Sequence, residues 1–261
     1  MLDSVRAIRY IKTMESGRNA PLLLQAERST GETLEVVVKP ASSECGTGGL
    51  IREALASMLA ADLGLPVAEP FLVWTEDDFI TSVVPAAVRA RFSSAVPAFG
   101  CALANGMSQY SSAVPFSATL TTQAGNAFAF DGGILNADRL LTKPNCLTDG
   151  TTLLLIDHEL SLNVAGRGFL AIDPWVTNAL APMTSGQTEH LFFKRIKGEQ
   201  LAVHDMLQTL GEISTARIDE YQSAIPVEWD GDAVLSGIVG YLEDLVTNAS
   251  ELSLKVEDVL A

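Results

Sequence analysis

The sequence predicts an α+β fold with a β-rich first part and a mainly helical second part. Short apolar runs separated by turn residues fill the beginning of the chain, whereas amphipathic patterns of helical period fill its end. Strands gathered in one stretch and helices in another favour an α+β architecture. A length of 261 residues with 48% hydrophobic residues suits one large domain or two small lobes.

The composition restricts the partners that we expect. A formal net charge of −15 disfavours nucleic acids and anionic membrane surfaces, because both call for clustered Lys and Arg. Three cysteines without a C-x-x-C pair indicate reduced thiols rather than a disulfide framework or a zinc site. The sequence shows no secretory signal and no membrane-spanning run, so we expect a cytoplasmic protein.

The first two strands are expected at residues 5–12 and 22–26. A polar turn containing Ser16 and Gly17 separates them. A plain hairpin loop is one interpretation of this turn. The other is a loop that covers bound phosphates, although a single glycine is a weak signal for it.

A third strand, at residues 33–38, ends in Lys39. This lysine is either a solvated strand-end residue or a phosphate-binding group. Residues 51–63 follow with helical periodicity, and Gly64 ends the helix. Glu53 would then lie in the first turn, where a carboxylate is favoured in any helix. The alternative is an ion pair between Glu53 and Lys39.

Two more strands are expected at residues 67–74 and 79–84. Pro85, Pro97 and Gly100 then punctuate a stretch of small residues. We therefore expect a boundary there that divides the chain into lobes of residues 1–97 and 98–261.

A hairpin is predicted around the Asp-Gly pair at residues 149–150, because this dipeptide favours a tight turn between strands. A two-residue turn would place Thr148 opposite Thr151. Asn145 and Asp157 then leave the hairpin at the same end, with Asp157 overhanging by three residues. Some curl of the chain is needed to bring the two side chains together.

The remaining segments are assigned more coarsely. Residues 101–127 are expected to be irregular or to form short helices. Helices are expected within residues 187–210, 214–224, 232–247 and 249–260. His190 and His204 are expected to be ordinary helix-surface or part-buried residues. His158 either orients Asp157 or only packs.

Asp138, Asn145 and Asp157 are therefore expected to converge. A carboxylate, then an amide, then a second carboxylate is the order of parts in enzymes that transfer phosphoryl groups from ATP. In those enzymes the first Asp receives the proton of the acceptor hydroxyl, and the Asn and second Asp hold Mg²⁺. Hard oxygen ligands of this kind suit Mg²⁺. A surface hairpin with ordinary turn residues is the alternative interpretation.

These motifs resemble those of the HipA-like kinases, in particular the short stand-alone branch of that family. The resemblance rests on Asn-Ala-Asp-Arg at residues 136–139, Pro-Asn-Cys-Leu at 144–147 and Ile-Asp-His-Glu at 156–159. The same motifs are also similar to the Asp-Arg-x-x-Asn core of phosphatidylinositol kinases. The motifs differ from those of ordinary protein kinases, because no His-Arg precedes Asp138 and Asp-His replaces Asp-Phe-Gly.

The resemblance implies a two-lobed, protein-kinase-like fold and a set of roles. Ser16, Gly17, Lys39 and Glu53 would bind ATP, with Lys39 also counted as catalytic. Asp138 would be the catalytic carboxylate, and Asn145 and Asp157 the Mg²⁺ ligands. Arg139 would either pair with Glu159 or lie near the γ-phosphate.

The resemblance implies a serine/threonine protein kinase, with a protein substrate and a toxin or effector role that an antitoxin or other regulator would control. A kinase for lipids or other small molecules is a second hypothesis. A non-catalytic, ATP-binding interaction protein is a third. Neither direct nucleic-acid binding nor membrane binding is expected.

Overall fold

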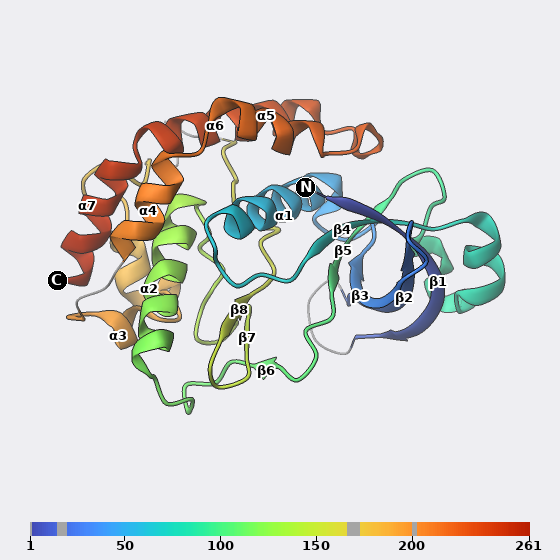
Figure 1. The fold of residues 1–261 in the computed structure, drawn as a ribbon, viewed down its shortest axis with the longest axis horizontal. Coiled ribbons are helices and arrows are strands. Elements are labelled where there is room, and N and C mark those ends of the chain that lie inside the picture. The colour runs from blue at the N-terminus through green and yellow to red at the C-terminus, as the bar shows by residue number, and fades with distance from the viewer. Residues whose placement is uncertain (1, 15–19, 166–172, 200–202) are drawn as a thin grey trace.

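A computed structural model describes residues 2–14, 20–165, 173–199 and 203–261. Five strands close into a barrel at one end of the molecule, on the right in Figure 1. The strands follow the order β1-β2-β3-β5-β4, and all neighbours are antiparallel except β1 and β4. They are β1 (Asp3–Thr13), β2 (Leu22–Arg28), β3 (Thr33–Lys39), β4 (Pro70–Trp74) and β5 (Ala98–Ala102).

The barrel core consists of every second residue of its strands, because successive side chains of a strand face opposite sides of the sheet. In β3, Val36 and Val38 are fully buried, whereas Lys39 at the strand end keeps 14% of its side chain exposed. The predicted strands at 5–12, 22–26, 33–38 and 67–74 are confirmed with shifted ends. β5 begins at the residue where the second lobe was expected, and it pairs with β3 and β4. The division into lobes at residues 97 and 98 stays a prediction.

The strand expected at residues 79–84 is wrong, since Phe79–Val83 forms a turn of π-helix. The acidic turn before it starts the helical hydrogen bonding, as Ile80 N donates to Glu76 O at 3.0 Å. Phe79 is buried and packs edge-on against Phe92, with ring centroids 6.3 Å apart. A short apolar run does not by itself distinguish a strand from a buried helical turn.

Helix α1 spans Gly46–Asp62 and runs across the molecule beside the barrel (Figure 1). It begins five residues before the predicted start at 51, because glycines lower helix propensity and hid its first turn. A Cβ on Gly49 would lie 2.5 Å from Cys45 Cβ, so this close approach needs glycine. Glu53 therefore lies well inside the helix, and the helix dipole does not explain it.

A small antiparallel sheet lies between the barrel and the helices. It consists of β6 (Ser108–Gln109), β7 (Cys146–Thr148) and β8 (Leu153–Leu155), in that order. The β7–β8 hairpin is confirmed, but its register is not the predicted one. Thr148 pairs with Leu153 rather than Thr151.

The carboxylate of Asp149 explains this longer turn. It accepts hydrogen bonds from the backbone N of Thr151 and Thr152, both at 2.8 Å, and from the Thr151 hydroxyl at 2.8 Å. An Asp side chain that caps the backbone in this way stabilises a wider turn than a bare Asp-Gly pair requires.

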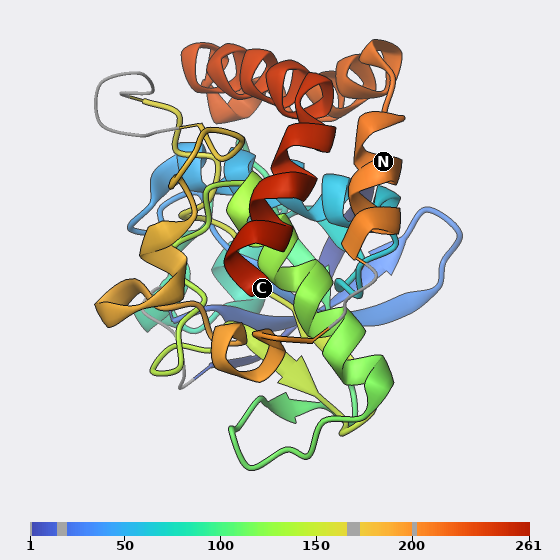
Figure 2. The same cartoon turned by 90° about the vertical axis from the view of Figure 1, so that its left-hand side faces the viewer.

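The opposite end of the molecule is helical, and Figure 2 shows α7 and α2 crossing there. The helices are α2 (Ala118–Gly133), α3 (Phe193–Ile196), α4 (Val203–Gly211), α5 (Thr215–Ser223), α6 (Asp232–Thr247) and α7 (Ala249–Leu260). Short 3-10 turns occur at Ala86–Arg91, Ala181–Thr184, Gly186–Thr188 and Val227–Trp229. Among the described residues, no helix combines the length and the apolar character needed to cross a membrane.

The expected helices of the C-terminal part are confirmed, whereas α2 corrects the prediction for residues 101–127. Ser117 caps α2, its hydroxyl accepting from Leu120 N at 3.2 Å. The helix ends in Gly132 and Gly133, where a Cβ would lie 3.0 Å from Leu180 Cδ2 and 3.3 Å from Leu252 Cδ2. Its glycines and threonines obscure the helical pattern in the sequence. Gly132 and Gly133, however, allow the helix to pack closely against Leu180 and Leu252.

Candidate active site

Lys39 lies at the centre of a cluster of carboxylates between the barrel and the small sheet. Its Nζ is 2.7 Å from Glu53 Oε2, 2.6 Å from Asp157 Oδ1 and 3.1 Å from Glu159 Oε2. Burial lowers the pKa of Lys39, but the three negative charges outweigh it and raise the pKa well above its usual value. The lysine is therefore charged at neutral pH.

Glu53 is buried on α1 and contacts both Lys39, at the end of β3, and the backbone that follows β8. Besides Lys39, it accepts a hydrogen bond from His158 N at 3.0 Å. Burial raises the pKa of Glu53, but the Lys39 charge and the His158 hydrogen bond hold the pKa well below its usual range. The ion pair of Lys39 and Glu53 is thus present, and a capping role for Glu53 is excluded by its position in α1.

The structure brings Asp138, Asn145 and Asp157 together as the sequence predicts. Asn145 Nδ2 donates to Asp138 Oδ2 at 3.0 Å and to Asp138 O at 3.2 Å. Lys143 Nζ lies 2.5 Å from Asp138 Oδ2 and 3.6 Å from Asp157 Oδ2. Lys143 was missed in the sequence, because a lysine beside a turn proline carries no signal until the loop is folded.

The changed hairpin register shortens the distance that the chain must cover. Ile156 N donates to Asn145 O at 3.1 Å, so Asp157 overhangs its partner strand by one residue rather than three. Asn145 and Asp157 both adopt left-handed backbone conformations, with φ of 44° and 63°. Asn and Asp tolerate this conformation better than other non-glycine residues, and such positions cluster at functional sites.

Of the two roles predicted for Arg139, the pair with Glu159 is wrong, and a place near the γ-phosphate stays a prediction. The guanidinium is fully buried and forms an ion pair with Asp131 on α2, with Nε 2.5 Å from Asp131 Oδ2. It also donates to the carbonyl oxygens of Asn145 and Ile156, the latter at 3.3 Å. Arg139 thus links α2 to the residue before β7 and the residue after β8, immediately before Asp157.

Asp131 is the hub of this buried network and was missed in the sequence. It accepts from Asn136 Nδ2 at 2.7 Å and from His190 Nε2 at 2.9 Å, in addition to Arg139. Burial raises the pKa of Asp131, but Arg139 and His190 hold the pKa far below its usual range. The carboxylate is therefore ionised and fully paired.

The two histidines of the site pack within the same network. His190 is buried beside Phe128 and lies outside any helix, which corrects its assignment as a helix-surface or part-buried residue. His158 Nε2 lies 3.1 Å from the Arg139 guanidinium and Nδ1 3.7 Å from Glu53 Oε1. Of the two interpretations of His158, packing is the one that these contacts favour. The side chain of His204 lies outside the described part of the chain.

Below neutral pH, we expect the stability of the protein to fall as His190 titrates in the unfolded state. Burial lowers the pKa of His190, although Asp131 opposes the shift. The unfolded chain then takes up a proton from about pH 6.5 downward while the folded state does not, a slope approaching ~1.4 kcal/mol per pH unit. Urea unfolding between pH 7.5 and 5 should show a flatter profile for His190→Gln. Parallel profiles for both proteins would contradict this assignment.

The donor chemistry at the hairpin end fits a bound Mg²⁺. Asn145 directs its amide nitrogen toward Asp138, which leaves its oxygen available on the other side. Together with the Asp157 carboxylate, this offers the hard oxygen ligands that Mg²⁺ prefers. Among the described residues, Lys39 contacts Glu53, Asp157 and Glu159, and Lys143 contacts Asp138 and Asp157.

Ser16 and Gly17, in the turn between β1 and β2, are predicted parts of the site that lie outside the described residues.

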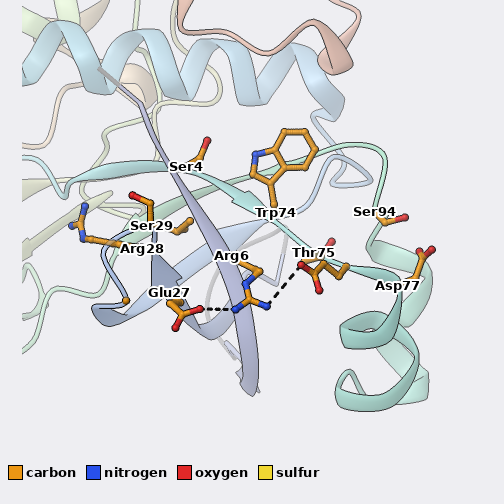
Figure 3. A pocket seen from close by; sticks show the side chains of 12 residues that line it. Ser4, Arg6, Glu27, Arg28, Ser29, Trp74, Thr75, Asp77 and Ser94 are labelled. Atoms are coloured by element: carbon orange, nitrogen blue, oxygen red, sulfur yellow. Dashed lines mark hydrogen bonds and ion pairs between the residues drawn. The ribbon is translucent and has the colours of Figure 1, made fainter.

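A pocket of ≈ 770 Å³ lies beside β1 and β4, away from this cluster (Figure 3). Its lining includes Arg6 and Trp74 but none of the predicted site residues. Arg6 is paired there with Glu27 at 2.6 Å and lies 3.8 Å from Glu76. The pocket is therefore separate from the site around Lys39.

A strand lysine paired with a helix glutamate, beside an Asp–Asn–Asp constellation on a loop and hairpin, defines the class of kinase-type phosphotransferases. A sequence model of the HipA-like kinases matches residues 8–234. The chain belongs to the HipA-like kinase family. No curated protein matches the chain.

A solved structure supports the same fold. The Helicobacter pylori proinflammatory kinase CtkA is similar over 99% of this chain and 99% of its own, with a TM-score of 0.55 and 11% sequence identity. At this identity the likeness concerns the fold alone. Family and fold together support a kinase.

Proposed function

We propose that this protein is a two-lobed, ATP-dependent serine/threonine protein kinase whose active site lies between the barrel and the helical part. The observation that carries the proposal is the contact chain from Lys39 through Asp157 and Lys143 to Asp138 and Asn145. Neighbouring groups in this chain of contacts lie within 3.6 Å of one another. Membership of the HipA-like kinase family supports the same conclusion.

In this proposal each residue has one task. Lys39, held by Glu53, binds the α- and β-phosphates of ATP, and the loop with Ser16 and Gly17 covers the phosphates. Asn145 and Asp157 hold Mg²⁺, which when bound neutralises phosphate charge. Asp138 orients the acceptor hydroxyl and takes its proton. Positioning and charge neutralisation then provide most of the rate acceleration.

The proposed setting is the cytoplasm, where ATP is available, with a protein as the acceptor and an antitoxin or other regulator as partner. CtkA is a proinflammatory kinase of the same fold, which supports an effector role here. The class of acceptor is open to a direct test. γ-Labelled ATP is incubated with the protein and a cell lysate, and the labelled products are separated and hydrolysed.

Phosphoserine or phosphothreonine in the protein fraction is the expected result of this test. Label confined to the lipid or small-molecule fraction would instead favour a kinase for those acceptors. Nucleotide binding without label in any fraction would favour a non-catalytic role.

Lys39→Met should weaken Mg-ATP binding by about 10–100-fold, because a charged hydrogen bond contributes ~1.5–3 kcal/mol. Isothermal titration calorimetry measures the change. Lys194→Met is the matched control, since this lysine has a 79% exposed side chain and pairs only on the surface with Glu189.

Removing Lys39 leaves buried carboxylates uncompensated, so Lys39→Arg provides a second variant that keeps the charge. It should bind Mg-ATP more weakly than the wild type, because a guanidinium has a different shape and donor geometry. Wild-type affinity in both folded variants would contradict the role of Lys39.

A further inference from the structure

Lys143 is a second cation of the site, and its position is fixed by the fold. Its backbone N and O both pair with Leu140, at 3.1 Å and 3.0 Å, in the tight loop after Asp138. Pro144 follows and restricts the backbone of Lys143 further. The side chain therefore extends from a rigid base and is not part of a loose surface loop.

The ammonium group of Lys143 connects two carboxylates that have different proposed tasks. It lies 2.5 Å from Asp138 Oδ2, the oxygen that also accepts from Asn145, and 3.6 Å from Asp157 Oδ2. The transferred phosphoryl group must pass between the carboxylate that receives the hydroxyl proton and the one that holds the metal. In the proposed kinase, Nζ therefore lies between these two carboxylates, beside the path of the transferred phosphoryl group.

We propose that Lys143 is a catalytic residue whose ammonium group binds the γ-phosphoryl oxygens during transfer. This inference rests on the proposed kinase function and adds a residue to its active site. Lys39 already contacts three carboxylates, so it is committed to the nucleotide side of the cluster. Lys143 has a 37% exposed side chain and remains accessible to a ligand.

The alternative interpretation is that Lys143 only forms an ion pair that stabilises the loop and has no role toward a phosphate. Half-exposed ion pairs contribute little to stability, typically about 0–1 kcal/mol. A lysine that only stabilised the loop would not need to reach both carboxylates. The flexible stem of a lysine also allows Nζ to leave Asp157 for a phosphate oxygen while it stays near Asp138.

The step that Lys143 assists is balanced without any change in the lysine itself. The acceptor oxygen bonds to the γ-phosphorus as the bond between that phosphorus and the bridging oxygen of ADP breaks. The hydroxyl proton passes to Asp138, and ADP leaves with the bonding electron pair. Lys143 keeps its three protons and provides only charge and hydrogen bonds, which are most effective where charge develops in the transition state.

Binding of a transition-state mimic tests this proposal without a known acceptor. The affinity for Mg-ADP alone is compared by calorimetry with the affinity for Mg-ADP plus aluminium fluoride, which imitates the transferred group. The proteins are the wild type, Lys143→Met, Lys143→Arg and the surface control Lys194→Met. Thermal melting confirms that each variant is folded.

Lys143→Met should lose at least ~10-fold of the preference for the aluminium fluoride complex, with Mg-ADP affinity changed by less than about threefold. Lys143→Arg should retain part of the preference, and Lys194→Met all of it. An unchanged preference in Lys143→Met would overturn the proposal. A wild type that binds no Mg-ADP would overturn the kinase function, and this inference with it.

Discussion

Asp138→Asn should reduce phosphate transfer by about 10²–10⁴-fold, the usual contribution of a positioned general base, and leave Mg-ATP affinity nearly unchanged. Asparagine has almost the same shape as aspartate, so the contacts with Asn145 and Lys143 can largely persist. The amide, however, cannot accept the proton of the acceptor hydroxyl. Label transfer measures the rate, and calorimetry measures binding separately.

Asp258→Asn is the matched control, because this aspartate is exposed on α7 far from the site in sequence. It should transfer phosphate at the wild-type rate. Equal rates in Asp138→Asn and the wild type would show that another group takes the proton, and would remove Asp138 from the catalytic role.

Asp131→Ala should destabilise the fold by about 3–5 kcal/mol, the usual effect of removing one partner of a buried ion pair. Arg139 would then be left as a fully buried charge without its carboxylate, and His190 would lose its acceptor. The hairpin that carries Asp157 depends on the same guanidinium, so we expect folding and activity to fall together. Urea unfolding followed by circular dichroism gives the change in free energy.

Asp131→Asn separates the charge from the hydrogen bonds. It can still accept from one or two of the three donors, so its loss of stability should lie between those of the wild type and the alanine variant. Asp258→Asn again serves as the surface control, with an expected change within ~0.5 kcal/mol. A loss below about 1 kcal/mol for Asp131→Ala would contradict the view that this pair holds the site together.

The sequence predicts the convergence of Asp138, Asn145 and Asp157 because the three lie on one hairpin and the turn just before it. Local order and strand pairing are enough to bring such residues together. The same holds for α6 and α7, whose amphipathic periods are long and uninterrupted. Here local pattern and global fold agree, and such segments are the most readily predicted.

The role of Asp131 could not be predicted from the sequence. This aspartate lies in a stretch of glycine, alanine and phenylalanine, and its partners Arg139 and His190 meet it only after the helical part has folded. Without knowledge of this carboxylate, the two roles predicted for Arg139 were a pair with Glu159 and a place near the γ-phosphate, and neither included Asp131. The hairpin register failed for a related reason, since the cap formed by Asp149 outweighs the tight-turn preference of Asp-Gly.

The central claim is that Lys39, Asn145 and Asp157 bind a metal–nucleotide complex, and a crystal structure with Mn²⁺ and a non-hydrolysable ATP analogue tests it most directly. The account predicts an anomalous Mn²⁺ peak within coordinating distance of the oxygens of Asn145 and Asp157, with Lys39 on the phosphates, because hard oxygen ligands favour such a cation. A metal held without these two residues, or a nucleotide bound elsewhere, such as in the pocket beside Arg6 and Trp74, would contradict the account.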